Sequence, residues 1–131
     1  MAGETDLSVL LKTLKPKLNE GSYVFISLKD INHIPRANIL FEFKEEEGTT
    51  IILKQEKADV HQLNYDFVAS WITLTVHSSL NAVGLTAAVA NALTKHNISS
   101  NVVAAFYHDH IFVATKDTAK SMQVLQEFSK K

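Results

Sequence analysis

The sequence predicts an α+β protein in which helices cover antiparallel sheets and two similar halves follow one another. Short runs rich in β-branched and aromatic residues indicate strands, and apolar residues at helical spacing indicate amphipathic helices. Along the 131 residues, the predicted strands occur largely as adjacent pairs that form hairpins. Folding of a chain this long buries roughly two-thirds of its unfolded surface, which is enough for one shared core or two small ones.

The first half begins with a predicted amphipathic helix. Leucines occupy positions 7, 10, 11, 14 and 18, behind a Thr5-Asp6 capping pair. We expect Pro16 to bend or restart this helix near Lys15, because a proline ring clashes with the preceding helical turn. Gly21 should end it.

Three predicted strands and a short helix complete the first half. Pro35 and its polar neighbours predict an exposed connection over Lys29–Asn38. The acidic run Glu45–Glu47 beside Gly48 predicts a hairpin tip in solvent, since adjacent strand carboxylates point to opposite faces and do not converge on a metal ion. The predicted elements are strands at Ser22–Leu28, Ile39–Lys44 and Thr50–Lys54 and a helix at Glu56–Leu63.

The second half opens with a predicted strand, Trp71–His77, that alternates clearly. Positions 72, 74 and 76 form an apolar face, whereas Trp71, Thr73 and Thr75 form the other face. The tryptophan predicts that this second face meets another layer, either the first half or a second copy of the protein. The elements predicted after this strand are a loop at Ser78–Val83, a helix closed by Lys95–Asn97, strands at Asn101–Tyr107 and His110–Thr115 joined by a tight His108-Asp109 turn, and a helix at Asp117–Phe128.

The second half therefore runs β-α-β-β-α, which is a ferredoxin-like βαββαβ unit without its final strand. The first half, α-β-β-β-α, has a spare strand but lacks the helix between its first two strands. Three strands alone leave unpaired edges and an uncovered face. We therefore expect the halves, residues 1–66 and 67–131, to complete one another in a ferredoxin-like sandwich.

Composition argues against several classes of function. The net charge is −1, and Arg36 is the only arginine among thirteen basic residues, so no arginine cluster is present for nucleic acid. No uncharged run approaches the ~20 apolar residues of a membrane span, and the early charges do not fit a signal peptide. The absence of cysteine rules out disulfides and fits a reducing compartment. We expect a cytoplasmic protein without a cofactor.

Strand directions predict that polar side chains gather at one end of the second-half sheet. In the ferredoxin-like order the first and third strands are antiparallel neighbours, so His77 should approach His110. The following helix begins at the same end, where its unpaired N–H groups near Gly84 can bind a carboxylate. Gly84 either lets a ligand approach closely or eases the packing of the helix on the sheet.

The segment Trp71–Thr115 resembles an ACT domain. The resemblance rests on Ile72-Thr-Leu-Thr-Val-His, Asn81-Ala-Val-Gly-Leu, Asn97-Ile-Ser and Phe106-Tyr-His-Asp-His-Ile-Phe-Val. The whole chain is similar to small bacterial tandem-ACT proteins with Val-His-Ser-Ser-Leu, Val-Gly-Leu-Thr-Ala and Tyr-His-Asp-His patterns. This resemblance implies an ACT-type fold and a regulatory module that binds an amino acid or a similar small molecule at a subunit or subdomain interface.

The resemblance also places individual residues. Asn81 and Gly84 take the positions of the usual Asp and Gly of the family's Asp-x-Pro-Gly pattern, and Val83 stands where proline is common. Asn81 lacks the charge that would pair with a ligand's ammonium group, and Asp109 can supply that charge instead. The predicted ligand-binding residues are His77, Ser78, Ser79, Leu80, Asn81, Ala82, Val83, Gly84, Leu85, Tyr107, His108, Asp109 and His110.

Two other chemistries use residue types found at this end. His77, His108 and His110 are imidazoles of the kind that bind zinc, nickel or copper, but a His-x-His at a hairpin is frequently only a polar tip. A serine at position 78 or 79 with a histidine and Asp109 has the residue types of a hydrolase triad. Neither serine lies in a Gly-x-Ser-x-Gly turn, and small polar residues before a helix are more simply caps.

The sequence thus predicts a regulatory, non-catalytic homodimer that binds an amino acid or another small carboxylate. The amides of Val83–Leu85 would hold the carboxylate, Asn81 and Asp109 would contact the amine, and the histidines and the tyrosine would line the pocket. The alternative is an oligomerisation or interaction module whose ACT-like half has lost ligand binding.

Overall fold

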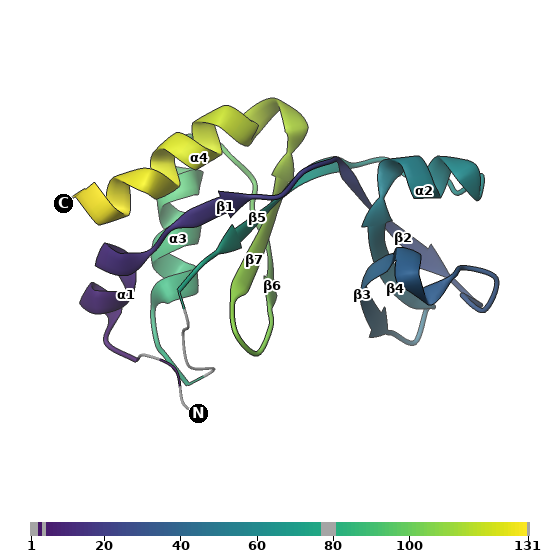
Figure 1. The fold of residues 1–131 in the computed structure, drawn as a ribbon, viewed down its shortest axis with the longest axis horizontal. Helices are drawn as coiled ribbons and strands as arrows, with labels where there is room; N and C mark the ends of the chain where they lie inside the picture. The colour runs from purple at the N-terminus through teal and green to yellow at the C-terminus, as the bar shows by residue number, and fades with distance from the viewer. Residues whose placement is uncertain (1–2, 4, 77–80, 131) are drawn as a thin grey trace. The chain divides into compact units, whose positions relative to one another are not determined.

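The computed structural model describes residue 3, residues 5–76 and residues 81–130. The chain forms two compact units, a larger one made of Met1–Glu20 and Ser70–Lys131 and a smaller one made of Gly21–Ala69 (Figure 1). The N-terminal segment therefore packs with the C-terminal part of the chain. The predicted boundary between the two halves, residues 1–66 and 67–131, describes their order along the sequence and stays a prediction.

The larger unit has a ferredoxin-like strand order, β1-β5-β7-β6. Strand β1 pairs antiparallel with β5, and β6 pairs antiparallel with β7. This order makes β5, β6 and β7 the first three strands of a βαββαβ unit and makes β1 the missing fourth. Its elements are α1 (Leu7–Thr13), β1 (Pro16–Leu18), β5 (Val68–Leu74), α3 (Leu85–Thr94), β6 (Asn101–Ala104), β7 (Asp109–Ala114), η2 (Thr115–Asp117), α4 (Thr118–Gln126) and η3 (Glu127–Lys130).

The predicted helix over residues 7–18 is only half right. It starts as expected, with the Asp6 carboxylate accepting hydrogen bonds from the N–H groups of Ser8 and Val9, but it ends at Thr13. The residue before a proline is pushed toward extended backbone, and Pro16 opens a strand rather than a second helical turn. Proline is tolerated in a strand that pairs on one side only. The strand that was missing from the second half therefore comes from the N-terminal segment.

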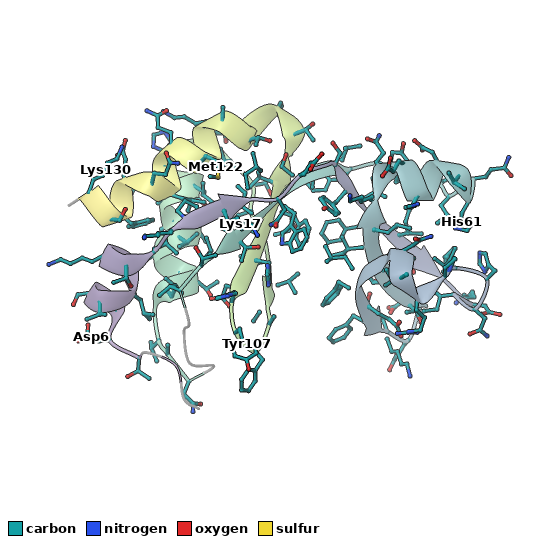
Figure 2. The ribbon with its side chains drawn as sticks, in the orientation of Figure 1. Asp6, Lys17, His61, Tyr107, Met122 and Lys130 are labelled. Carbon is teal, nitrogen blue, oxygen red and sulfur yellow. The ribbon has the colours of Figure 1, made fainter. Side chains whose placement is uncertain are left out.

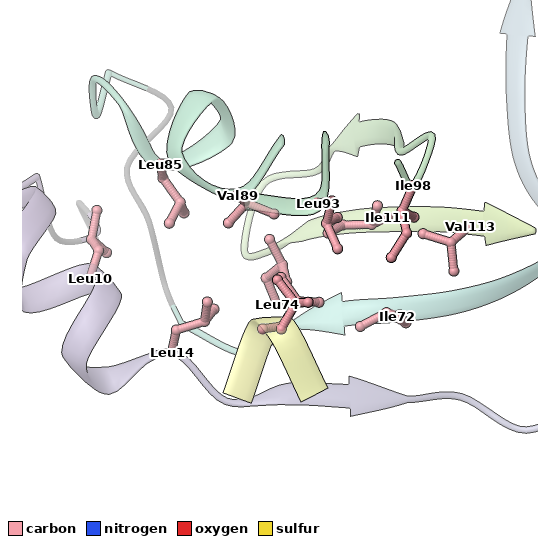
Figure 3. Packing of buried hydrophobic residues seen from close by; sticks show 12 residues of the cluster. Leu10, Leu14, Ile72, Leu74, Leu85, Val89, Leu93, Ile98, Ile111 and Val113 are labelled. Carbon is pink, nitrogen blue, oxygen red and sulfur yellow. The ribbon is translucent and has the colours of Figure 1, made fainter. Parts of the chain in front are cut away.

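The core of the larger unit lies between its helices and one face of its sheet (Figure 3). Leu10 and Leu14 from the N-terminal segment are completely buried in it. Truncating a leucine of this kind to alanine costs about 2–5 kcal/mol. The cluster consists of Leu10, Leu14, Ile72, Leu74, Leu85, Val89, Leu93, Ile98, Ile111, Val113, Val124 and Leu125.

The smaller unit repeats the ferredoxin-like order as β3-β4-β2-β5. Its fourth strand is the beginning of β5, where Val68 and Ala69 pair with β2. The predicted hairpin is confirmed, because β3 and β4 pair antiparallel, and the 3-10 turn η1 stands where a full helix would lie. The predicted exposed connection over Lys29–Asn38 is only partly right, since Ile34 within it is buried in the core of this unit. Its elements are β2 (Tyr23–Leu28), η1 (Arg36–Asn38), β3 (Ile39–Lys44), β4 (Thr49–Lys54) and α2 (Gln55–Val60).

Strand β5 is thus used by both units, as the first strand of one and the fourth of the other. It begins at Val68 and ends at Leu74, three residues earlier at each end than Trp71–His77 predicts. The predicted alternation within it is confirmed, because Ile72 and Leu74 are buried in the core of the larger unit. None of the helices in the described parts of the chain is long and apolar enough to cross a membrane.

Candidate functional site

The predicted site lies at the end of the larger unit where β5 stops, α3 starts and the β6–β7 hairpin turns over (Figure 1). His77, Ser78, Ser79 and Leu80 lie outside the described residues. Of the others, Asn81–Val83 precede α3, and Tyr107 to His110 belong to the hairpin. The hairpin approaches the residues that follow β5 through His108, whose Nδ1 atom lies 3.4 Å from the carbonyl oxygen of Val76.

Gly84 is the N-cap residue of α3, and its backbone has φ of +102°, which L side chains rarely adopt. As a glycine, the N-cap residue itself has no side chain that could cap the helix. A Cβ atom on Gly84 would lie 3.0 Å from Cδ2 of Leu7, a residue of α1. Helix α1 therefore uses the space that a side chain at position 84 would fill. The sequence left two explanations for this glycine, ligand approach and close packing, and the fold shows the close packing.

The residues beside Gly84 have different roles. Leu85 is only 3% exposed and packs in the core, so its side chain does not contribute to a binding surface. Ala82 packs partly against the same core. Val83 is 82% exposed, which places it at the surface next to the helix start.

The hairpin turns over earlier than predicted. Its last strand pair joins Ala104 to Asp109, and the N–H of Ala105 donates to the carbonyl of His108. The predicted His108-Asp109 turn is therefore wrong: the turn spans residues 105–108 and Asp109 already belongs to β7. Tyr107 is exposed in this turn, and Figure 2 shows it at the tip. The centroid of its ring lies 5.0 Å from the centroid of the Phe106 ring.

Two titratable groups of the site have shifted pKa values. Burial raises the pKa of the Asp109 carboxyl, an effect that the nearby His108 partly offsets. Burial also lowers the pKa of His110, and the positive charge of His108 lowers it further. Both shifts express the cost of keeping a charge in a half-buried environment.

The structure does not bring all predicted site residues to one face of the sheet. Ile111 points into the core beneath α3, so strand alternation puts Asp109 on the helix side and His110 on the opposite side. There the indole of Trp71 donates to Nδ1 of His110 at 2.9 Å, and the Thr73 hydroxyl lies 3.1 Å from the same atom. His110 therefore belongs to a second cluster, distinct from the start of α3.

Asn19 is a member of this second cluster that the sequence analysis missed. Its side-chain amide donates to the hydroxyl of Thr73 at 2.9 Å and to the carbonyl of Trp71 at 3.2 Å. The alternation of β5 already placed Trp71 and Thr73 on one face. Nothing in the pattern around Asn19 links it to residues more than 50 positions away.

A cavity of about 360 Å³ lies elsewhere in the larger unit, between α3 and α4. Its lining includes small apolar side chains and the charged Lys95 and Glu127. It shares no residue with the predicted site. Within the described residues no three His, Asp or Glu side chains gather as metal ligands, and His77 of the predicted histidine trio is not among those residues.

The two units together define a tandem ferredoxin-like α+β protein. Two models of the ACT domain match the chain, one over residues 2–70 and the other over residues 67–127. The chain belongs to the ACT domain family, as the resemblance of residues 71–115 predicted, and each half carries one such domain.

Solved structures with the same fold agree with this assignment. A protein of unknown function from Vibrio cholerae, described as a possible transport protein, is 43% identical, with a TM-score of 0.85 over 94% of this chain and 95% of that one. A protein from Agrobacterium tumefaciens is 20% identical, with a TM-score of 0.72 over 88% and 89%. The regulatory subunit of aspartate kinase from Thermus thermophilus is 7% identical, with a TM-score of 0.58 over 88% and 98%. No curated protein matches the chain.

Proposed function

We propose that this protein is a regulatory module without catalytic activity that binds an amino acid at the start of α3. The observation that carries the proposal is the helix start itself, where the N-cap residue is a glycine without a capping side chain, in a unit that belongs to the ACT family. The first N–H groups of a helix have no intrahelical acceptors and carry a partial positive charge. They suit a ligand carboxylate.

Asp109 supports an amine on the same ligand. Strand alternation places it on the face of the sheet that α3 covers, and it makes no ion pair within the described parts of the chain. Because burial disfavours its charge, a ligand ammonium group beside it would stabilise the carboxylate. A carboxylate-binding helix start and an acid on one face match the two charged groups of an amino acid.

Three further parts of the proposal rest on family and composition. ACT-type regulation usually works through association, so we propose a homodimer whose state or partner contacts respond to the ligand. The absence of cysteine supports a cytoplasmic location. The aspartate kinase subunit named above is described as regulatory, which fits a regulatory role here.

A test of the proposal is a thermal-shift screen against the twenty amino acids, followed by two variants of Val83. This side chain is exposed, so replacing it leaves the core intact. Val83→Glu puts a negative charge beside the helix start and should weaken binding of a carboxylate, whereas the neutral Val83→Gln should bind like the wild type. A ligand at 100 times its dissociation constant stabilises the fold by about 2.7 kcal/mol.

The second candidate function is an interaction module that binds no metabolite. The exposed aromatic rings of Phe106 and Tyr107 at the hairpin tip favour it, since large apolar side chains in solvent are common at protein interfaces. The absence of a thermal shift with any amino acid, together with a stable dimer in light scattering, would favour this candidate. Equal binding by the Glu and Gln variants would remove the helix start as the ligand site.

A further inference from the structure

The second cluster lies on the face of the larger unit's sheet that points away from α3. Trp71 and Thr73 come from β5 and His110 from β7, while Asn19 directly follows β1. Lys17 lies opposite Thr73 in the β1–β5 pair, and directly paired residues share a face. This face therefore combines a cation, Lys17, with a set of hydrogen-bonding side chains.

Each hydrogen bond of the cluster has a defined donor and acceptor, and the series of donors begins at Asn19. The carbonyl oxygen of Trp71 can only accept, so the atom of Asn19 that lies 3.2 Å from it is the NH₂ group. The same NH₂ group donates to the Thr73 hydroxyl oxygen at 2.9 Å. Thr73 accepts there and is left with its own hydrogen to donate, which it directs to His110 Nδ1 at 3.1 Å.

The indole of Trp71 fixes the other end of this chain. An indole N–H has a hydrogen to donate and no lone pair to accept, so His110 Nδ1, 2.9 Å away, must carry the lone pair. A neutral imidazole with an unprotonated Nδ1 carries its hydrogen on Nε2. Protonation of Nδ1 would place a new N–H group opposite the donors of Trp71 and Thr73, which is unfavourable. Burial also lowers the pKa of this ring.

The Nε2 atom of His110 has no hydrogen-bond partner within the described residues. The ring of Trp71, with its centroid 5.7 Å away, packs beside the imidazole and restricts its rotation. Lys17 on the same face makes no ion pair with another described residue. The N–H of His110 and the ammonium group of Lys17 on one face can together bind a negatively charged hydrogen-bond acceptor.

We propose that this face of the larger unit's sheet, the one that points away from α3, carries a second anion site, in which His110 Nε2–H and Lys17 bind a carboxylate. Asn19 is a positioning residue of this site, since it acts on His110 only through Thr73. Among the described residues, His108 is the charged group that acts on the pKa of this ring, and Asp109 is its chain neighbour on the opposite face of the sheet. This site is independent of the ligand proposed for the start of α3.

The first experiment tests the imidazole in the ligand-free, full-length protein. Long-range ¹H–¹⁵N spectra of ¹⁵N-histidine-labelled protein should show His110 as the Nε2–H tautomer at pH 7. Asn19→Asp removes the donor to Thr73, and Trp71→Phe removes the indole donor; each should raise the pKa of His110 measured by titration. Asn101→Asp is the matched control, because its amide donates to a carbonyl of the same sheet without touching His110.

The second experiment titrates the protein with sodium acetate, with sodium chloride at equal ionic strength as the control. Acetate should shift the His110 Nε2 signal, and Lys17→Gln should weaken acetate binding several-fold. An Nδ1–H tautomer, or an Asn19→Asp variant that behaves like Asn101→Asp, would overturn the positioning argument. Equal shifts with acetate and chloride would overturn the anion site, whatever the amino-acid screen shows at α3.

Discussion

Replacing Gly84 by alanine tests how the start of α3 is built. At φ of +102° an L residue costs about 1–2 kcal/mol more than glycine. The new Cβ would also lie 3.0 Å from Leu7, and pushing that side chain aside adds on the order of 1 kcal/mol. The expected destabilisation is therefore about 2–3 kcal/mol, or a fall in Tm of roughly 10 °C for a domain of this size.

The chain offers a matched control for this change. Gly21 has nearly the same φ, +99°, but a Cβ there would meet its nearest neighbour, Lys54, at an ordinary 3.7 Å. Gly21→Ala should therefore carry the backbone cost without the crowding, and Gly84→Ala should be the more damaging of the two in urea unfolding.

A double variant separates the two contributions further. Leu7→Ala opens the crowded space, so Gly84→Ala should cost less in that background than in the wild type, by on the order of 1 kcal/mol. A Tm of Gly84→Ala within about 2 °C of the wild type would refute the reasoning. It would mean that Leu7 and the backbone adjust freely, and that the glycine is not needed for packing.

Three other substitutions have expected outcomes. Ser121→Ala should stabilise the protein by about 1 kcal/mol in urea unfolding, because the completely buried Ser121 hydroxyl has no hydrogen-bond partner among the described residues. Hydrogen bonds from Ser8 lower the pKa of Asp6, so its stabilising effect is complete above its ordinary pKa of about 3.9 and is lost as the pH falls through the lower folded value. Asp6→Ala should thus lower Tm at neutral pH and converge with the wild type in strong acid. The lowered pKa of His110 likewise contributes stability that is present above about pH 6.5 and is lost as the pH falls through the pKa of the folded state. His110→Asn removes this titrating group but keeps an acceptor for the Trp71 indole, so it should flatten the pH dependence of Tm.

Local periodicity predicted much of the fold, because most elements bury one side of a regular pattern. The alternation of β5 and the helical stripe of α3 place Ile72, Leu74, Val89 and Leu93 in one core, as expected. The segment at Pro16 is the exception. Its leucines fit helical spacing equally well, and only pairing with residues 72–74 makes it a strand. A contact between positions so far apart is invisible to any local window.

The candidate site was predictable to the same extent. Strand directions correctly placed the hairpin beside the end of β5, as the contact between His108 and Val76 shows. They did not separate Asp109 from His110, because the sequence analysis put the turn at these two residues and so left their faces undefined. Once β7 begins at Asp109, alternation alone sends His110 to the side of Trp71.

The N-terminal segment gives both candidate sites their shape. Leu7 of α1 packs beside Gly84 at the start of α3, and Asn19 sets the hydrogen-bond chain that ends at His110. Between them, β1 completes the sheet by pairing with β5. A displacement of this segment would therefore change the start of α3 and the donor set of His110 together, even though the two sites lie on opposite faces of the sheet.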